Sequence, residues 1–192
     1  MCAFYKLLNE NTFAYGGFIY PSYPVKGDDL VGMELVTQLD ELNEIGFDGI
    51  KMLEGKPNLY KKVGNPLDSE LFDSVFAKME KENIFVDVSH LNEKSFFAAL
   101  DKSDFPLATH SNCKSICDNP RNLTDQQIKA LCEKDGIIGL CFYPDFLGQN
   151  VMQKIYENIY HIADMGFENS IAIGSDFDGG EMDKSLDKIS KV

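Results

Sequence analysis

The chain has 192 residues, of which 44% are hydrophobic and 26% are charged. This is enough apolar material for one sizeable core and too little chain for two domains of ordinary size, so we expect one domain over residues 1–192. The 31 acidic residues outnumber the 18 lysines and arginines, and a net charge of −13 repels phosphate backbones and anionic lipids, which excludes nucleic acids and membranes as expected partners.

Six short apolar runs alternate with segments of helical periodicity. The expected strands are, in chain order, Tyr15–Tyr20, Gly49–Leu53, Ile84–Ser89, Leu107–Thr109, Ile137–Phe142 and Ser170–Gly174. Between them, Leu30–Ile45 and Leu71–Glu82 carry apolar residues at helical spacing. Thr124 and Gln127 match the capping-box pattern, which predicts a helix that runs to about Lys134.

This alternation is typical of βα units arranged around a parallel sheet. A closed barrel of eight such units usually takes about 250 residues, whereas this chain supplies six units. The pattern therefore predicts an α/β fold, with either an open sheet or a barrel that lacks two units.

The cysteines and the first residues bear on the cellular setting. The five cysteines are an odd number and mostly lie within periodic segments, unlike those of a disulfide-stapled secreted domain. The first residues lack the basic and long apolar regions of a signal peptide, so we expect none. No apolar run has transmembrane length. These features favour a reducing, cytoplasmic setting.

Residues that suit metal binding follow three of the expected strands. His90 and His110 end two consecutive strands, and Asp176 ends the last one. Because sites in parallel α/β folds form at the carboxyl ends of the strands, we expect these residues to converge. Imidazoles and carboxylates are ligands for Zn²⁺ or a similar divalent ion. A histidine at a strand end is also commonly a hydrogen-bonded boundary residue, and both interpretations stay open on spacing alone.

The second half of the chain carries five motifs in order. They are V-D-V-S-H at 86–90, T-H-S-N at 109–112, C-D-N-P-R-N-L-T-D at 117–125, G-L-C-F-Y-P at 139–144 and G-S-D-F-D-G at 174–179. This series resembles the successive signatures of the membrane (renal) dipeptidase family of the amidohydrolase superfamily. The resemblance implies a (β/α)₈ barrel with a binuclear zinc centre that hydrolyses dipeptides.

Carried over by position, the resemblance implies that His90 and His110 are zinc ligands. It also implies that Arg121, the only arginine in the chain, holds the substrate carboxylate with two parallel hydrogen bonds, and that Asp176 moves protons. The ordinary alternative for Arg121 is a surface residue near a helix start. For Asp176 and Asp178 it is a turn closed by the side chain, and we assign Asp178 to the shape of the loop.

The first half departs from that family pattern. No histidine precedes His90, so the first-strand His-x-Asp pair and a further substrate-contacting histidine are absent. Residues 14–66, with G-G-F at 16–18 and G-F-D-G-I-K-M-L-E-G-K-P at 46–57, resemble the broader metal-dependent amidohydrolases that include decarboxylases of aromatic acids. Both halves resemble parts of one barrel, which implies a partial (β/α)₈ TIM-type barrel of about six units, with the first two missing.

Glu54 follows the second expected strand and is followed by glycine, like the metal-bridging glutamate of the dipeptidases. We therefore include Glu54 as a metal ligand. The alternatives are a solvated loop charge at Glu54, or a carbamylated Lys51 as in some related amidohydrolases. His161 lies in a helical stretch and receives no site role.

We expect a zinc-dependent dipeptidase with His90, His110 and Glu54 as metal ligands, Arg121 for substrate binding and Asp176 as the catalytic residue. Two other interpretations stay open. One is a mononuclear amidohydrolase or decarboxylase acting on a non-peptide carboxylate, and the other is a degenerate or truncated barrel without catalysis. The expected partners are a dipeptide substrate and further copies of the chain, because an incomplete barrel leaves apolar strand edges exposed and so favours a homo-oligomer.

Overall fold

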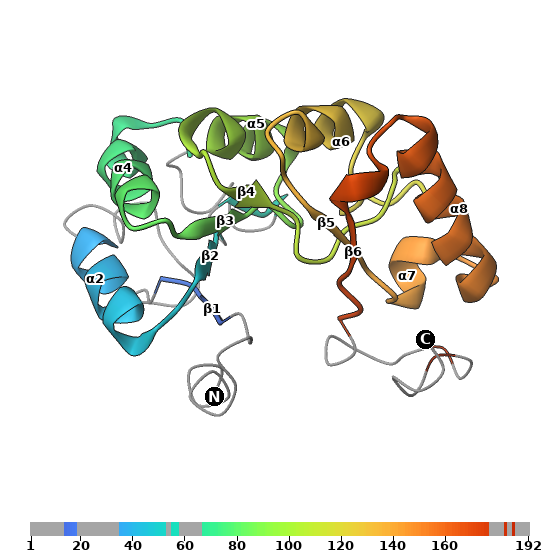
Figure 1. Cartoon of the computed structure of the whole chain (residues 1–192), viewed down its shortest axis with the longest axis horizontal. Coiled ribbons are helices and arrows are strands. Elements are labelled where there is room, and N and C mark those ends of the chain that lie inside the picture. The colour runs from blue at the N-terminus through green and yellow to red at the C-terminus, as the bar shows by residue number, and fades with distance from the viewer. Residues whose placement is uncertain are drawn as a thin grey trace. The chain divides into compact units, whose positions relative to one another are not determined.

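The computed structural model describes residues 14–18, 35–52, 55–57, 67–176, 183 and 186. Short parallel strands alternate with helices along the chain, as expected for an α/β fold (Figure 1). The chain divides into two compact units, Met1–Pro106 and Leu107–Val192; the expectation of a single domain stays a prediction. Among the described residues, every helix is too short or too polar to cross a membrane.

The first unit is built on three parallel strands, β1 (Tyr15–Gly16), β2 (Gly49–Lys51) and β3 (Phe85–Asp87). β4 (Pro106–Leu107), at the boundary of the units, completes the strand order β1-β2-β3-β4. Ile50 and Val86 are fully buried neighbours in this sheet, so their face of the strands belongs to the core. Side chains alternate along a strand, which places Lys51 and Asp87 on the opposite face.

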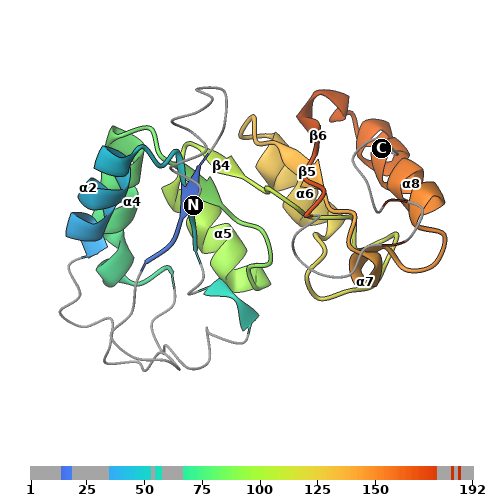
Figure 2. The same cartoon turned by 90° about the horizontal axis from the view of Figure 1, so that it is seen from below.

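Helices α2 (Leu35–Ile45), α4 (Asp73–Lys81) and α5 (Glu93–Lys102) complete the core of this unit, with the 3₁₀ turn η3 (Glu70–Phe72) leading into α4. α4 contacts α2, α5 and β3, and Figure 2 shows α2 beside α4. The apolar face of each helix is buried, as Leu39, Phe76 and Phe96 illustrate. Helical periodicity thus predicts the buried face of α2 and α4 correctly.

The second unit contains the parallel strands β5 (Ile138–Leu140) and β6 (Ile171–Ile173), with Ala108 bridged to Ile138 just after β4. Its helices are α6 (Asp125–Cys132), α7 (Pro144–Leu147) and α8 (Val151–Asp164), followed by the 3₁₀ turn η4 (Glu168–Ser170). The capping box at Thr124 and Gln127 is confirmed, because each side chain bonds the backbone of the other residue.

All six expected strand regions contain a strand, but each strand is shorter than its apolar run. The expected helix over Leu71–Glu82 is also confirmed, with its first turn in 3₁₀ form, whereas residues 30–34 of the expected Leu30–Ile45 helix lie outside the described part. The four-residue helix α7 was not predicted, since four residues are too few to show a helical period.

Two glycines let the carboxyl ends of three strands approach one another closely. A Cβ atom at Gly139 would lie 2.2 Å from the carbonyl oxygen of Thr109, and one at Gly174 would lie 1.9 Å from the same oxygen. Both distances are far inside van der Waals contact. Only glycine therefore fits at Gly139, within β5, and at Gly174, directly after β6.

We predict that Gly174→Ala lowers the free energy of unfolding by at least about 1–3 kcal/mol, because the methyl group must push the Thr109 carbonyl aside. Urea unfolding followed by circular dichroism measures the loss. Gly166→Ala is the matched control, since Gly166 has a positive φ of 89° but no neighbour within 4 Å of its added Cβ. A loss for Gly174→Ala below this range would mean that the Thr109 carbonyl yields to the added methyl group, and would contradict the prediction.

Candidate active site

His110 directly follows the fourth strand region in the second unit and is 8% exposed. Its Nδ1 lies 2.6 Å from Oγ1 of Thr109. This contact orients the imidazole ring and leaves Nε2 as the nitrogen that could bind a metal ion. The position of His110 agrees with the expectation that it ends a strand.

Asn112 fixes the loop that follows His110. Its Nδ2 donates to the Cys141 carbonyl at 2.9 Å, and its Oδ1 accepts from the Cys141 amide at 3.2 Å. A fully buried side chain thus bonds the backbone at the end of β5 as a neighbouring strand would. The motif T-H-S-N contains Asn112 but does not indicate its role. An asparagine just after an apolar strand is the sequence signal for such a buried hydrogen-bonding side chain.

Asp176 lies three residues beyond β6, is half-buried and adopts the left-handed conformation with φ 59°. The chain before it is held to β5 by a hydrogen bond from the Phe142 amide to the Ser175 carbonyl. The Cys141 thiol lies 4.0 Å from Oδ2 of Asp176. Aspartate and asparagine adopt the left-handed conformation more readily than most residues, and Asn83, Asp135 and Asn150 share it, so the backbone of Asp176 by itself assigns it no role.

Arg121 and Asp176 line the same cavity, whose volume is about 370 Å³. Tyr143, Asp145 and Phe146 form another part of its wall. Sequence analysis placed Arg121 and Asp176 in one site from their motifs, and the cavity brings the two together. The aromatic residues of the cavity wall, Tyr143 and Phe146, were not predicted, because no residue of the motif at 139–144 was expected to contact a ligand.

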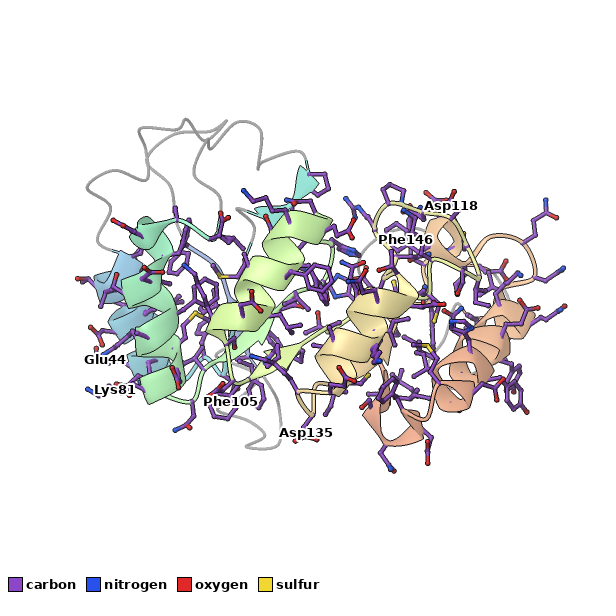
Figure 3. The ribbon with its side chains drawn as sticks, turned by 90° about the horizontal axis from the view of Figure 1, so that it is seen from above. Glu44, Lys81, Phe105, Asp118, Asp135 and Phe146 are labelled. Atoms are coloured by element: carbon purple, nitrogen blue, oxygen red, sulfur yellow. The ribbon has the colours of Figure 1, made fainter. Side chains whose placement is uncertain are left out.

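The turn that carries Arg121 is bound to α7 by two asparagine side chains. Asn119 Nδ2 donates to the Asp145 carbonyl at 3.0 Å, and Asn122 Nδ2 donates to the Phe146 carbonyl at 2.8 Å. The Arg121 guanidinium carbon lies 5.4 Å from the centre of the Phe146 ring, which Figure 3 labels. In the described part of the chain, no carboxylate lies within ion-pair distance of Arg121.

His90 directly follows the third strand region in the first unit and is 4% exposed. Like Asp176, it adopts a left-handed conformation, with φ 65°. Two residues later, Asn92 caps α5 and its side chain donates to the Gly55 carbonyl at 2.6 Å, while its amide donates to the same oxygen at 2.9 Å. Gly55, the residue after Glu54, is therefore hydrogen-bonded to Asn92, which lies two residues after His90. Glu54 itself lies outside the described residues, as does Asp178.

Lys51 and the buried Asp87 face each other across β2 and β3, with Nζ 4.0 Å from Oδ2. Asp87 also accepts a hydrogen bond from the Ser89 amide at 2.9 Å. Burial, together with the charges of Asp87 and Asp48, raises the pKa of the Tyr15 hydroxyl well above its usual value. The contact with Asp87 gives Lys51 an acidic neighbour in the sheet, and a carbamylated Lys51 stays a prediction.

The described residues alone do not assemble a complete metal centre. Within them, no three His, Cys, Asp or Glu side chains lie close enough to hold one ion. His90 and His110 each supply a buried imidazole suited to such an ion, but each belongs to a different unit.

His161 binds neighbouring side chains rather than a strand-end site, in agreement with the absence of a site role for it. Its Nε2 lies 2.8 Å from Oδ1 of Asp125 and 3.1 Å from Oγ of Ser115. In a Ser-His-Asp triad the two partners contact opposite ring nitrogens, whereas here one nitrogen meets both. The cluster therefore joins α8 to the start of α6 and does not activate the serine.

The comparisons with known proteins decide the family. A family model described as membrane dipeptidase, peptidase family M19, matches residues 69–192. The chain belongs to the membrane dipeptidase family. It is 31% identical to Dipeptidase verJ of Clonostachys rogersoniana over 180 residues, which cover 84% of this chain and 46% of that protein. It is also 39% identical over 102 residues to an uncharacterized Klebsiella pneumoniae protein from the pqqA 5′ region, covering 49% of this chain and 38% of that one.

Solved dipeptidase structures share the fold. A metallopeptidase from Rhodobacter sphaeroides, bound to a phosphinate mimic of L-Ala-D-Ala, gives a TM-score of 0.70 at 24% identity over 87% of this chain and 51% of that one. A second solved dipeptidase of family M19 gives the same TM-score and covers 53% of its own chain. The chain thus spans about half the length, or less, of the family members that it matches.

Cys113 offers a test of the packing behind the Arg121 turn. Burial, with smaller contributions from Asp125 and Cys132, raises the pKa of its thiol to about 12. We predict that iodoacetamide at pH 8 leaves Cys113 unmodified in the native protein and modifies it in denaturant, because only the thiolate reacts. Mass spectrometry of the tryptic peptides checks this, with the half-buried Cys117 as the internal control. Modification of Cys113 in the native protein at the rate of Cys117 would contradict this packing.

Proposed function

We propose that this chain takes part in metal-dependent hydrolysis of dipeptides, with the substrate carboxylate held at Arg121. The observation that carries this proposal is the single cavity that Arg121 and Asp176 line in the second unit. Membership of the membrane dipeptidase family supports it, because the motifs that contain Arg121 and Asp176 both fall within the matched residues.

Arg121 would bind the carboxylate of the dipeptide through two parallel N–H donors, which fixes the orientation of the substrate as well as its position. Its guanidinium keeps a full positive charge at every physiological pH. Asp176, across the same cavity, would accept a proton from the attacking water and return it to the leaving amine. Asp176 is half-buried, lines the cavity and lies three residues after the end of β6.

His90, His110 and Glu54 would serve as metal ligands, and zinc is the ion that we propose for them because imidazole and carboxylate suit it. Such an ion supplies Lewis-acid polarisation of the scissile carbonyl and activation of water. The contact of Thr109 with His110 Nδ1 supports the assignment of Nε2 as the ligand atom. Glu54 is assigned from its sequence motif, in which a glycine follows it.

We also propose that the two units form part of a (β/α)₈-type barrel. The parallel pairing of successive strands and the likeness to solved dipeptidases over 87% of the chain support this. Ile173 in β6 is 71% exposed, and this apolar side chain would favour the self-association that we propose.

We predict that His90→Ala and His110→Ala each remove most of the bound metal and leave the fold largely intact, because ligands at strand ends face the site rather than the core. Metal content is measured by mass spectrometry of the purified protein, with circular dichroism as the check on folding. His161→Ala is the matched control and should keep its metal, since His161 contacts Asp125 and Ser115. Full metal in either of the first two variants, or a wild type without metal, would refute the ligand assignment.

We predict that Arg121→Lys weakens binding of a dipeptide by roughly 5- to 150-fold, since lysine keeps the charge and loses the two-pronged donor geometry. Isothermal titration calorimetry with a slowly hydrolysed dipeptide measures this. Lys129→Ala, which removes an exposed cation from α6, is the control and should bind as the wild type does. Equal affinity of wild type and Arg121→Lys would place Arg121 outside the site.

A further inference from the structure

Arg121 rests on an aromatic ring and has no acidic partner in the described part of the chain. Its guanidinium carbon lies 5.4 Å from the centre of the Phe146 ring, within the range of a cation–π contact. Phe146 is 7% exposed, so the ring is held by the protein on nearly all sides. We propose that Phe146 is a positioning residue that holds the Arg121 guanidinium ready for a carboxylate. This inference rests on the proposed function of Arg121.

The stacked arrangement leaves the donors of the guanidinium available. A guanidinium stacks through the flat face of its π system, whereas its five N–H groups point outward in its plane. A carboxylate partner would instead engage those same N–H groups and neutralise the charge. Phe146 therefore restrains Arg121 without competing with a ligand carboxylate for hydrogen bonds.

The ring and the arginine are tied to each other through the backbone as well. Asn122 Nδ2 donates to the Phe146 carbonyl at 2.8 Å and to the Cys117 carbonyl at 2.9 Å. The Arg121 amide donates to Oδ1 of Asn119 at 2.9 Å, which shapes the turn between the two asparagines. Two asparagine side chains of the turn thus bond the backbone of α7 at Asp145 and Phe146.

A second aromatic residue fixes the orientation of the ring. Tyr143 packs edge-on against Phe146, with ring centres 5.1 Å apart and an interplanar angle of 64°. Edge-to-face packing of this kind opposes rotation of the Phe146 ring. Phe146 and Arg121 both line the cavity, so a ring held in one orientation restrains the guanidinium at the cavity wall.

Because Arg121 is the only arginine in the chain, its Nε–H group gives the only arginine Nε–H signal in a nitrogen-15 NMR spectrum. We expect Phe146→Leu, which keeps apolar volume and removes the ring, to move this signal and to lower its order parameter. Phe146→Tyr, which keeps the ring, should preserve both. Leu147→Ala is the matched control, since it removes buried packing from the same helix without touching Arg121.

Ligand binding provides the second measurement, with a slowly hydrolysed dipeptide and its carboxyl-terminal amide as probes. Phe146→Leu should weaken binding of the dipeptide by about 2- to 5-fold, the effect of losing an exposed cation–π contact, and leave binding of the amide unchanged. Phe146→Tyr should restore the ratio of the two affinities. Adding Phe146→Leu to Arg121→Lys should leave the ratio where Arg121→Lys alone puts it.

The two measurements separate failure of this inference from failure of the proposed function. An unchanged Arg121 Nε–H signal in Phe146→Leu, or the same change in Leu147→Ala, would overturn the positioning role whatever the protein binds. A wild type that binds dipeptide and amide equally well would refute the proposed function of Arg121, and the NMR result would then still show whether Phe146 orders it.

Discussion

The close approach of the Thr109 carbonyl to Gly139 and Gly174 is the constraint on which the second unit depends. This contact sets the distance between the segment at Thr109 and the strands β5 and β6. A single methyl group at either glycine would overlap the Thr109 carbonyl oxygen. The residues with chemical roles follow these points directly: His110 comes one residue after Thr109, and Asp176 two residues after Gly174. Loosening this contact would therefore move both side chains at once.

Beyond the strand ends, asparagine side chains bond backbone groups that a neighbouring strand would otherwise bond. Asn112 bonds both backbone groups of Cys141, and Asn158 accepts from the Cys113 amide at 2.7 Å while donating to the Lys154 carbonyl. Asn122 does the same between the Arg121 turn and α7. A carboxamide carries both a donor and an acceptor, so one buried side chain can satisfy two backbone groups that no strand reaches. These loops are irregular in shape and yet well bonded.

The sequence predicted the strand regions and the residues that follow them, for identifiable reasons. Apolar runs ending in His90, His110 and Asp176 mark strand ends, and each residue lies just beyond the strand region expected to precede it. The contact of Arg121 with Phe146 could not be predicted, since it joins a turn to the helix α7, 25 positions later, and the shape of that turn depends on side-chain hydrogen bonds. The same holds for Asn112 and Cys141, whose contact is visible only once the residues after Ala108 lie beside β5. Local periodicity carries no information about such long-range pairs.

The charge of the whole chain makes the single arginine more significant. A protein with a formal net charge of −13 repels an approaching carboxylate, although salt at physiological strength screens this repulsion beyond about 8 Å. Recognition of a carboxylate must then be local, and Arg121 can provide it because its charge is not cancelled by a described acidic neighbour. Asp145 and Asp176 line the same cavity and favour a ligand that also carries a positive group. The proposed dipeptide substrate, as a zwitterion, carries both groups, whereas the alternative aromatic acid carries a carboxylate alone.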